Sequence, residues 1–140
     1  GNGLVRTAPV IDASRNIYLA TIRGSVYKFT PEGKQLWSYT DHASIPDVPA
    51  LLDGSLFVTT VKGVTIALDA ETGKELWRSQ VGPRSAGDTW SMTAGEGVVV
   101  AATSDNWQDN NCLVGLDAKT GAIKWRFKAD HTIYNVLCAI

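Results

Sequence analysis

The chain has 140 residues, of which 44% are apolar and 19% are charged, and its formal net charge is −1. This composition supplies a hydrophobic core and excludes a disordered chain kept open by charge. The sequence contains neither a run of Lys and Arg nor an apolar stretch of about 20 residues, so we expect no nucleic-acid partner and no membrane insertion.

The first predicted unit covers residues 4–40 and ends on the segment Thr30-Pro-Glu-Gly-Lys-Gln-Leu-Trp37. Gly33 can take the positive φ that a tight turn requires. Phe29 stands where the two later units carry an aspartate, so we expect Pro31 to set this turn through its fixed φ. Trp37 then falls in the last strand of the unit.

The second predicted unit covers residues 46–80 and contains four short strands. Asp53-Gly54 is a hairpin signal between the first two strands. Asp69-Ala-Glu-Thr-Gly73 closes the last hairpin, because the Asp69 carboxylate can accept hydrogen bonds from the backbone of its own turn. Trp77 follows in the last strand. The strands are expected at 50–52, 56–60, 64–68 and 75–78.

The third predicted unit covers residues 88–128 and repeats the same closing turn as Asp117-Ala-Lys-Thr-Gly121, followed by Trp125. Its strand at 98–102 is apolar at every position, which is typical of a strand buried on both faces of its sheet. A fourth unit is expected to begin at His131 and to continue through 131–140.

The tryptophan of the closing segment recurs after 40 and then after 48 residues. A period of about 40–50 residues with short strands in each unit predicts the blades of a β-propeller. Frequent Gly and β-branched residues exclude a helical solenoid of the same period. We therefore expect an all-β fold, a partial β-propeller of about three and a half four-stranded antiparallel blades.

The repeated tryptophans are expected to dock one blade on the next, since an indole fills the gap between two sheets while its N–H finds an acceptor. Stacking on a ligand is the less favoured interpretation. Propellers close with about 4–8 blades, so this number of blades does not close a ring. A protein partner or the remainder of the propeller should cover the open terminal blades. The residues assigned to the structural repeat are Trp37, Trp77, Trp125, Gly33, Gly73, Gly121, Asp69 and Asp117.

The segments Leu68–Trp77 and Gly115–Trp125 resemble the repeat of the quinoprotein, or PQQ-type, β-propeller family. This family includes PQQ-dependent alcohol dehydrogenases as well as non-catalytic scaffolds of outer-membrane assembly. The resemblance covers nearly the whole chain and implies the propeller fold. It also implies an extracytoplasmic setting, for which the sequence has no independent signal: its start lacks the charged and apolar regions of a signal peptide.

A further stretch resembles the dehydrogenase branch of the family. Trp90-Ser91, a strand and Ser104-Asp105-Asn106-Trp107 are similar to its Trp-Ser, strand and Gly-Asp-Asn-aromatic sequence. The resemblance implies that Asn106 and Asp105 would bind calcium, that Trp90 would contact PQQ, and that Asp130 would serve the metal or act as base. The loop 104–111 is equally consistent with a solvated surface loop.

Several departures from the dehydrogenase pattern favour a non-catalytic segment. Ser104 replaces the motif glycine, the stretch after Asp130 holds extra residues, and the turn at 59–63 has no glutamate. The adjacent Cys-Cys pair of the dehydrogenases is absent, and Cys112 and Cys138 leave a bridge or two separate thiols open. We therefore expect a scaffold or protein-interaction segment without a cofactor. The alternative is a fragment of a calcium- and PQQ-dependent alcohol dehydrogenase.

Overall fold

The computed structural model describes residues 5, 7–85, 92–104, 111–131 and 133, which form three separate four-stranded β-sheets. In each sheet the strands follow one another in chain order as an antiparallel meander. The described residues contain no helix. The expected all-β partial propeller is confirmed. The strands are β1 (Val10–Ile11), β2 (Ile17–Ala20), β3 (Ser25–Phe29) and β4 (Gln35–Thr40); β5 (Ala50–Leu52), β6 (Ser55–Thr59), β7 (Val64–Asp69) and β8 (Glu75–Gln80); and β9 (Thr93–Gly95), β10 (Val98–Thr103), β11 (Cys112–Asp117) and β12 (Ile123–Lys128).

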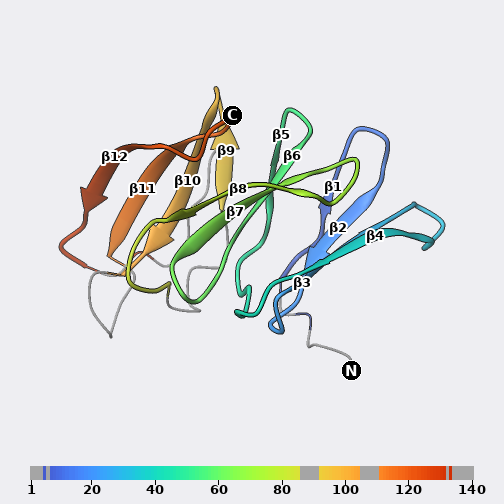
Figure 1. Cartoon of the computed structure of the whole chain (residues 1–140), viewed down its shortest axis with the longest axis horizontal. Helices are drawn as coiled ribbons and strands as arrows, with labels where there is room; N and C mark the ends of the chain where they lie inside the picture. Colours follow the sequence, from blue (N-terminus) through green and yellow to red (C-terminus); the bar gives the residue numbers. More distant parts are fainter. Residues whose placement is uncertain (1–4, 6, 86–91, 105–110, 132, 134–140) are drawn as a thin grey trace.

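The three sheets stand side by side like the blades of an open fan (Figure 1). The first strand of each sheet lies at one edge and the fourth strand at the other. Strand β5 contacts β9 of the following sheet, so the first strands converge. Because consecutive strands are antiparallel, the β1–β2 and β3–β4 turns share one end of a blade, and the β2–β3 turn lies at the other end with the connection to the next blade.

The closing turns of the second and third sheets have the same geometry. The Asp69 carboxylate accepts hydrogen bonds from the backbone N–H groups of Glu71 at 2.8 Å and Thr72 at 3.1 Å. Asp117 does the same for Lys119 at 2.9 Å and Thr120 at 3.0 Å. In each of these two turns the aspartate side chain satisfies backbone N–H groups of its own turn, which explains why the same residue pattern returns at the same place in both blades.

The closing turn of the first sheet is one residue shorter, which corrects the expected alignment of Phe29. Phe29 pairs with Gln35, whereas Leu68 pairs with Glu75 in the second sheet. Phe29 is therefore the counterpart of Leu68, and Thr30 takes the place of Asp69: the Thr30 N–H donates to the Lys34 carbonyl at 2.8 Å, as the Asp69 N–H does to the Lys74 carbonyl. Here the Thr30 carbonyl accepts the Gly33 N–H at 2.9 Å, a bond that the Asp69 carbonyl makes with Gly73 at 2.8 Å in the longer turn.

The core consists of two apolar layers, each between two neighbouring sheets. The first layer contains Tyr18, Val26, Ile45, Leu56, Val58, Ile66 and Leu68, and the second contains Phe57, Ala67, Val81, Val99, Ala101, Val114 and Leu116. Strands β6 and β7 supply both layers, because successive side chains of a strand point to opposite faces. Strands β6 and β7 are thus buried on both sides, which accounts for their mostly apolar sequences.

The third sheet is covered on one face only within the described residues. Val99 and Ala101 of β10 are fully buried in the second layer, whereas Val98 and Val100, which alternate with them, are only half-buried. All six residues of β12 are exposed. The expected fourth unit, 131–140, lies almost entirely outside the described residues.

Candidate functional site

The junction between the first two sheets is built around Trp37. Its indole Nε1 donates a hydrogen bond to the Ala70 carbonyl at 3.1 Å. Its ring lies against Gly73, where an added Cβ would come within 2.6 Å of the Trp37 Cδ2 atom. Gly73 also has a φ of +75°. Both facts require glycine at this position, because any other residue would carry a Cβ into the indole.

The junction between the second and third sheets repeats this arrangement one blade later. The Trp77 Nε1 donates to the Ala118 carbonyl at 3.1 Å, and a Cβ on Gly121 would lie 2.5 Å from the Trp77 Cε3 atom. The tryptophan of each blade therefore docks on the closing turn of the following blade.

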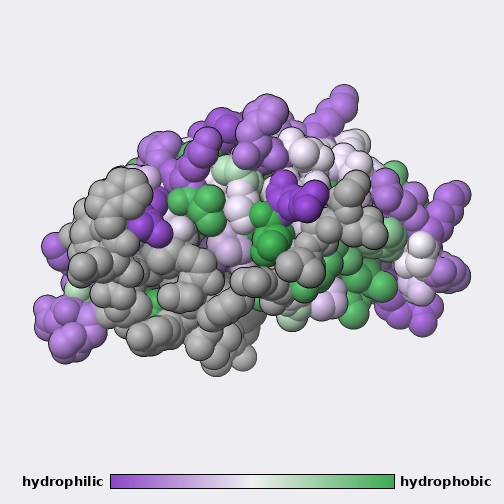
Figure 2. Space-filling view, turned by 90° about the horizontal axis from the view of Figure 1, so that it is seen from below, coloured by the Kyte–Doolittle hydropathy of each residue, from purple (hydrophilic) through white to green (hydrophobic). Residues whose placement is uncertain are grey.

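Trp125 occupies the equivalent place in the third sheet but has no docking turn in the described part of the chain. It is 42% exposed, and its indole makes no hydrogen bond to a described residue. Phe127, at 55% exposure, and Ile123, at 40%, are exposed on the same strand. Phe127 and Trp125 pair with Leu113 and Gly115, whereas Ile123, beyond a bulge, pairs with Leu116 of the layer against the second sheet. We call Trp125 and Phe127 the open face. Hydrophobic side chains also reach the surface elsewhere, among hydrophilic ones, on the face of the molecule that Figure 2 shows.

A polar network joins the outer strands of the first two sheets. The Arg78 guanidinium contacts Glu75 at 2.7 Å within its own blade and Asp41 at 3.1 Å in the preceding one. The Tyr39 hydroxyl donates to Glu75 at 2.7 Å. Arg78 and Tyr39 lower the pKa of Glu75 through these bonds, and burial and the Glu75 carboxylate raise the pKa of Tyr39 to about 12.

Asp47 is a buried carboxyl group at the end of the blades that holds the interblade connections. It lies just before β5 and is 1% exposed. Its Oδ1 atom has no hydrogen-bond partner among the described residues. Burial without a partner raises the pKa of Asp47 well above its ordinary value. An acid in such surroundings is a candidate functional group, although structural positions can show the same shift.

Of the residues that the sequence assigned to a dehydrogenase site, the structure describes only Asp130. Trp90, Asp105 and Asn106 lie outside the described residues. Asp130 is exposed beyond the end of β12. Among the residues that are described, no group of three or more His, Cys, Asp or Glu side chains is arranged to hold a metal ion.

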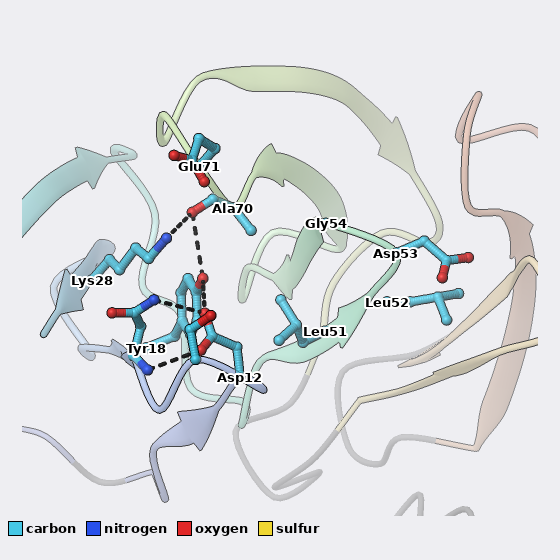
Figure 3. Close-up of a pocket in the computed structure, with 11 residues that line it drawn as sticks. Asp12, Tyr18, Lys28, Leu51, Leu52, Asp53, Gly54, Ala70 and Glu71 are labelled. Atoms are coloured by element: carbon cyan, nitrogen blue, oxygen red, sulfur yellow. Dashed lines mark hydrogen bonds between the residues drawn. The ribbon is translucent and has the colours of Figure 1, made fainter. Parts of the chain in front are cut away.

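Between the first and second sheets lies a cleft of about 400 Å³, which we call the first cleft (Figure 3). The Lys28 ammonium points into it and donates to the Ala70 carbonyl at 2.8 Å. The Tyr18 hydroxyl donates to the Asp12 carboxylate at 2.9 Å, and the Asn16 side chain donates to the same carboxylate at 3.1 Å. The other lining residues are Ser14, Leu51, Leu52, Asp53, Gly54, Ala70 and Glu71.

A second cleft of about 220 Å³ lies at the matching place between the second and third sheets. In the second sheet, Phe57 and Ala67 hold the positions that Tyr18 and Lys28 hold in the first. The strand register shows this, because Lys28 pairs with Trp37 and Ala67 pairs with Trp77. Sequence analysis missed Lys28. The available signal was a lysine opposite a repeat tryptophan, where the other units have Ala67 and Gly115.

The meander blades, the two layers between them and the tryptophan docking define this chain as part of a PQQ-type β-propeller. A family model described as "Outer membrane protein assembly factor BamB" matches residues 9–138. The chain therefore belongs to this family.

Individual relatives include both scaffolds and enzymes. The outer membrane protein assembly factor BamB of Burkholderia pseudomallei is 32% identical over 111 residues, which are 77% of this chain and 28% of the relative. The polyvinylalcohol dehydrogenase of Sphingopyxis sp. is 29% identical over 132 residues, which are 79% of this chain and 20% of that enzyme. The crystal structure of BamB from Moraxella catarrhalis superposes with a TM-score of 0.73 at 21% identity, covering 88% of this chain and 35% of that one.

The chain thus spans less than a third of the length of these curated relatives. The match identifies the repeat and the fold, while cofactor use differs between the relatives. Across the described residues, no helix combines the length and the apolar character needed to cross a membrane.

Proposed function

We propose that this chain is a non-catalytic propeller segment that works as a scaffold, with a surface built to be covered by protein. The observation that carries the proposal is the open face. Trp37 and Trp77 each dock on a neighbouring blade, whereas Trp125 and Phe127 on the equivalent strand face solvent. Large exposed aromatic side chains are typical of protein contacts.

The expected cover is a further blade of the same repeat or a partner that imitates one. Burying the open face would remove apolar area from water, which stabilises by about 25 cal/mol per Å². The indole N–H of Trp125 would gain a carbonyl acceptor in the same step. This supports a role in assembling a larger body.

A segment exchange tests the scaffold function. The matching segment of the Burkholderia pseudomallei assembly factor is replaced by this chain, and the chimera is assayed for outer-membrane protein assembly in a strain that lacks its own factor. We expect assembly to be restored, and we expect Trp125→Lys in the chimera to abolish it. An unfolded chimera is identified separately by circular dichroism, and a folded chimera without activity would contradict the scaffold proposal.

The second candidate is a segment of a calcium- and PQQ-dependent alcohol dehydrogenase, which the likeness to polyvinylalcohol dehydrogenase favours. On this proposal Asn106 and Asp105 would hold calcium, Trp90 would contact PQQ, and Asp130 would act as base. The reciprocal exchange into the Sphingopyxis enzyme tests it. Dehydrogenase activity that is retained in that chimera and lost on Asn106→Ala would favour the enzyme over the scaffold.

An extracytoplasmic location goes with either function. It is supported by the outer-membrane role printed in the name of the matching family. Fractionation of cells that express the native gene tests this location directly.

A further inference from the structure

The first cleft carries polar groups that blade docking does not require. Strand register places Tyr18, Lys28 and Trp37 side by side in the first sheet, and Phe57, Ala67 and Trp77 side by side in the second. Both tryptophans nevertheless donate to the next blade at the same distance of 3.1 Å. The Tyr18 hydroxyl and the Lys28 ammonium also donate to the Ala70 carbonyl, at 3.4 and 2.8 Å. Since phenylalanine and alanine suffice at the second junction, docking by itself does not require either group.

Lys28 is the group that most clearly points to a ligand. Its side chain is only 5% exposed, and its ammonium lines the first cleft. In the described part of the chain, its one hydrogen bond goes to the Ala70 carbonyl, its ammonium lies 5.2 Å from the centroid of the Tyr18 ring, and it joins no ion pair. An ammonium has three N–H donors, so two remain for a molecule in the cleft. Burying such a charge without an anion is unfavourable unless those donors find acceptors.

The Asp12 carboxylate forms the acceptor side of the first cleft. It is held in place by the Asn16 backbone N–H at 2.9 Å, the Asn16 side chain at 3.1 Å and the Tyr18 hydroxyl at 2.9 Å. The carboxylate of Glu71, an exposed residue, lies at the rim of the same cleft, whereas the Asp53 side chain points away from Lys28 and Asp12. Figure 3 shows that Asp12 and Glu71 come from turns of two different blades.

This arrangement selects a neutral ligand. The Lys28 ammonium and the carboxylates of Asp12 and Glu71 line the first cleft, so an anionic ligand meets an excess of negative charge and an organic cation meets Lys28. A hydroxyl group can accept from the ammonium and donate to a carboxylate. The volume of about 400 Å³ falls within the range of small-molecule sites. We propose that the first cleft binds a neutral polyhydroxylated molecule of the size of a mono- or disaccharide.

The second junction of the chain provides the pattern for a matched variant of the first. Tyr18→Phe combined with Lys28→Ala converts the first junction into a copy of the second, where the same pair of side chains is compatible with docking. The double variant should therefore fold, and its thermal midpoint should equal or exceed that of the parent chain, because a buried charge has been removed.

The experiment is a titration of the isotope-labelled chain with glucose and with cellobiose, followed by amide NMR shifts. We expect saturable shifts at Asn16, Gly54 and Glu71 around the first cleft and none at Gly97 and Lys119 around the second. In the double variant the apparent affinity should fall by about tenfold or more, which is the usual effect of losing a charged hydrogen bond and its partner.

Three outcomes would overturn the assignment. Neither sugar shifts the amides of the first cleft at saturating concentration. Acetate or inorganic phosphate shifts the same amides at lower concentration than the sugars, which would make the site anionic. The double variant binds as the parent does, or it unfolds, which would assign Tyr18 and Lys28 a purely structural role.

Discussion

Gly73 shows how one residue decides whether two blades can meet. Its positive φ and the Trp37 ring above it act together, whereas Gly33 has a φ of +89° but nothing within 4 Å of an added Cβ. Comparing substitutions at the two glycines therefore distinguishes the cost of backbone strain from the cost of disturbed packing between blades.

We predict that Gly73→Ala destabilises the chain by about 2–4 kcal/mol, from backbone strain plus overpacking against Trp37. Gly33→Ala is the matched control and should show only the strain, about 1–2 kcal/mol. Urea unfolding followed by tryptophan fluorescence measures both values. Equal losses in the two variants would mean that the indole contact contributes nothing.

Asp47 gives the second prediction at the scale of a residue. Burial raises its pKa, so the folded state keeps the proton over a pH range where the unfolded chain has lost it. Stability from this group is therefore highest at low pH and falls as pH rises from the ordinary value of 3.8 toward the folded pKa, by at most about 1.4 kcal/mol per pH unit.

Asp47→Asn removes that titration. We expect the variant to gain stability relative to the parent as pH rises from about 5 to about 7, within the slope given by proton linkage. Denaturant unfolding at several pH values measures the difference, and Asp130→Asn, at an exposed position, is the control. A difference that does not change with pH would show that Asp47 has found a partner.

Among the elements, the fourth strand of each blade carries the docking tryptophan, but its surroundings differ between the first two blades and the third. In β4 and β8 the tryptophan reaches the closing turn of the next blade, and in β12 the same residue faces solvent. The strand sequence alone does not distinguish these cases.

Replacing the indole by a phenyl ring tests this difference. Trp37→Phe loses the hydrogen bond to the Ala70 carbonyl and part of the packing, and should lower the free energy of unfolding by about 1–3 kcal/mol. Trp125→Phe in the isolated chain should change it by less than about 0.5 kcal/mol, as at other exposed positions. Calorimetry of both variants compares them, and a large effect at Trp125 would show that the open face is already covered.

For the whole molecule, the open face predicts self-association of the isolated chain. Exposed apolar strips of this kind attract other apolar surfaces. We expect Trp125→Lys combined with Phe127→Lys to reduce association in analytical ultracentrifugation without lowering the thermal midpoint. Leu36→Lys combined with Leu76→Lys is the control, because these residues are similarly exposed but lie on β4 and β8. If both pairs act alike, the effect is general solubility.

Much of the fold could be predicted from the repeat itself. Asp69, Gly73 and Trp77 are close in the chain, and turn chemistry is local, so their pattern indicated the closing hairpin and the tryptophan-bearing strand. The shorter turn at Phe29 was predicted incorrectly, because the number of residues in a bulged hairpin depends on the pairing of β3 with β4 rather than on the spacing of Gly33 and Trp37.

The sequence by itself determined the class of fold, the identity of the repeat and the meander within each blade, because these depend on local periodicity and turn residues. Only the tertiary structure decided which carbonyl each tryptophan reaches, that Lys28 and Asp12 line the same cleft, and that Asp47 is buried without a partner. Those features depend on how residues far apart in the chain come together, which local periodicity and turn residues do not determine.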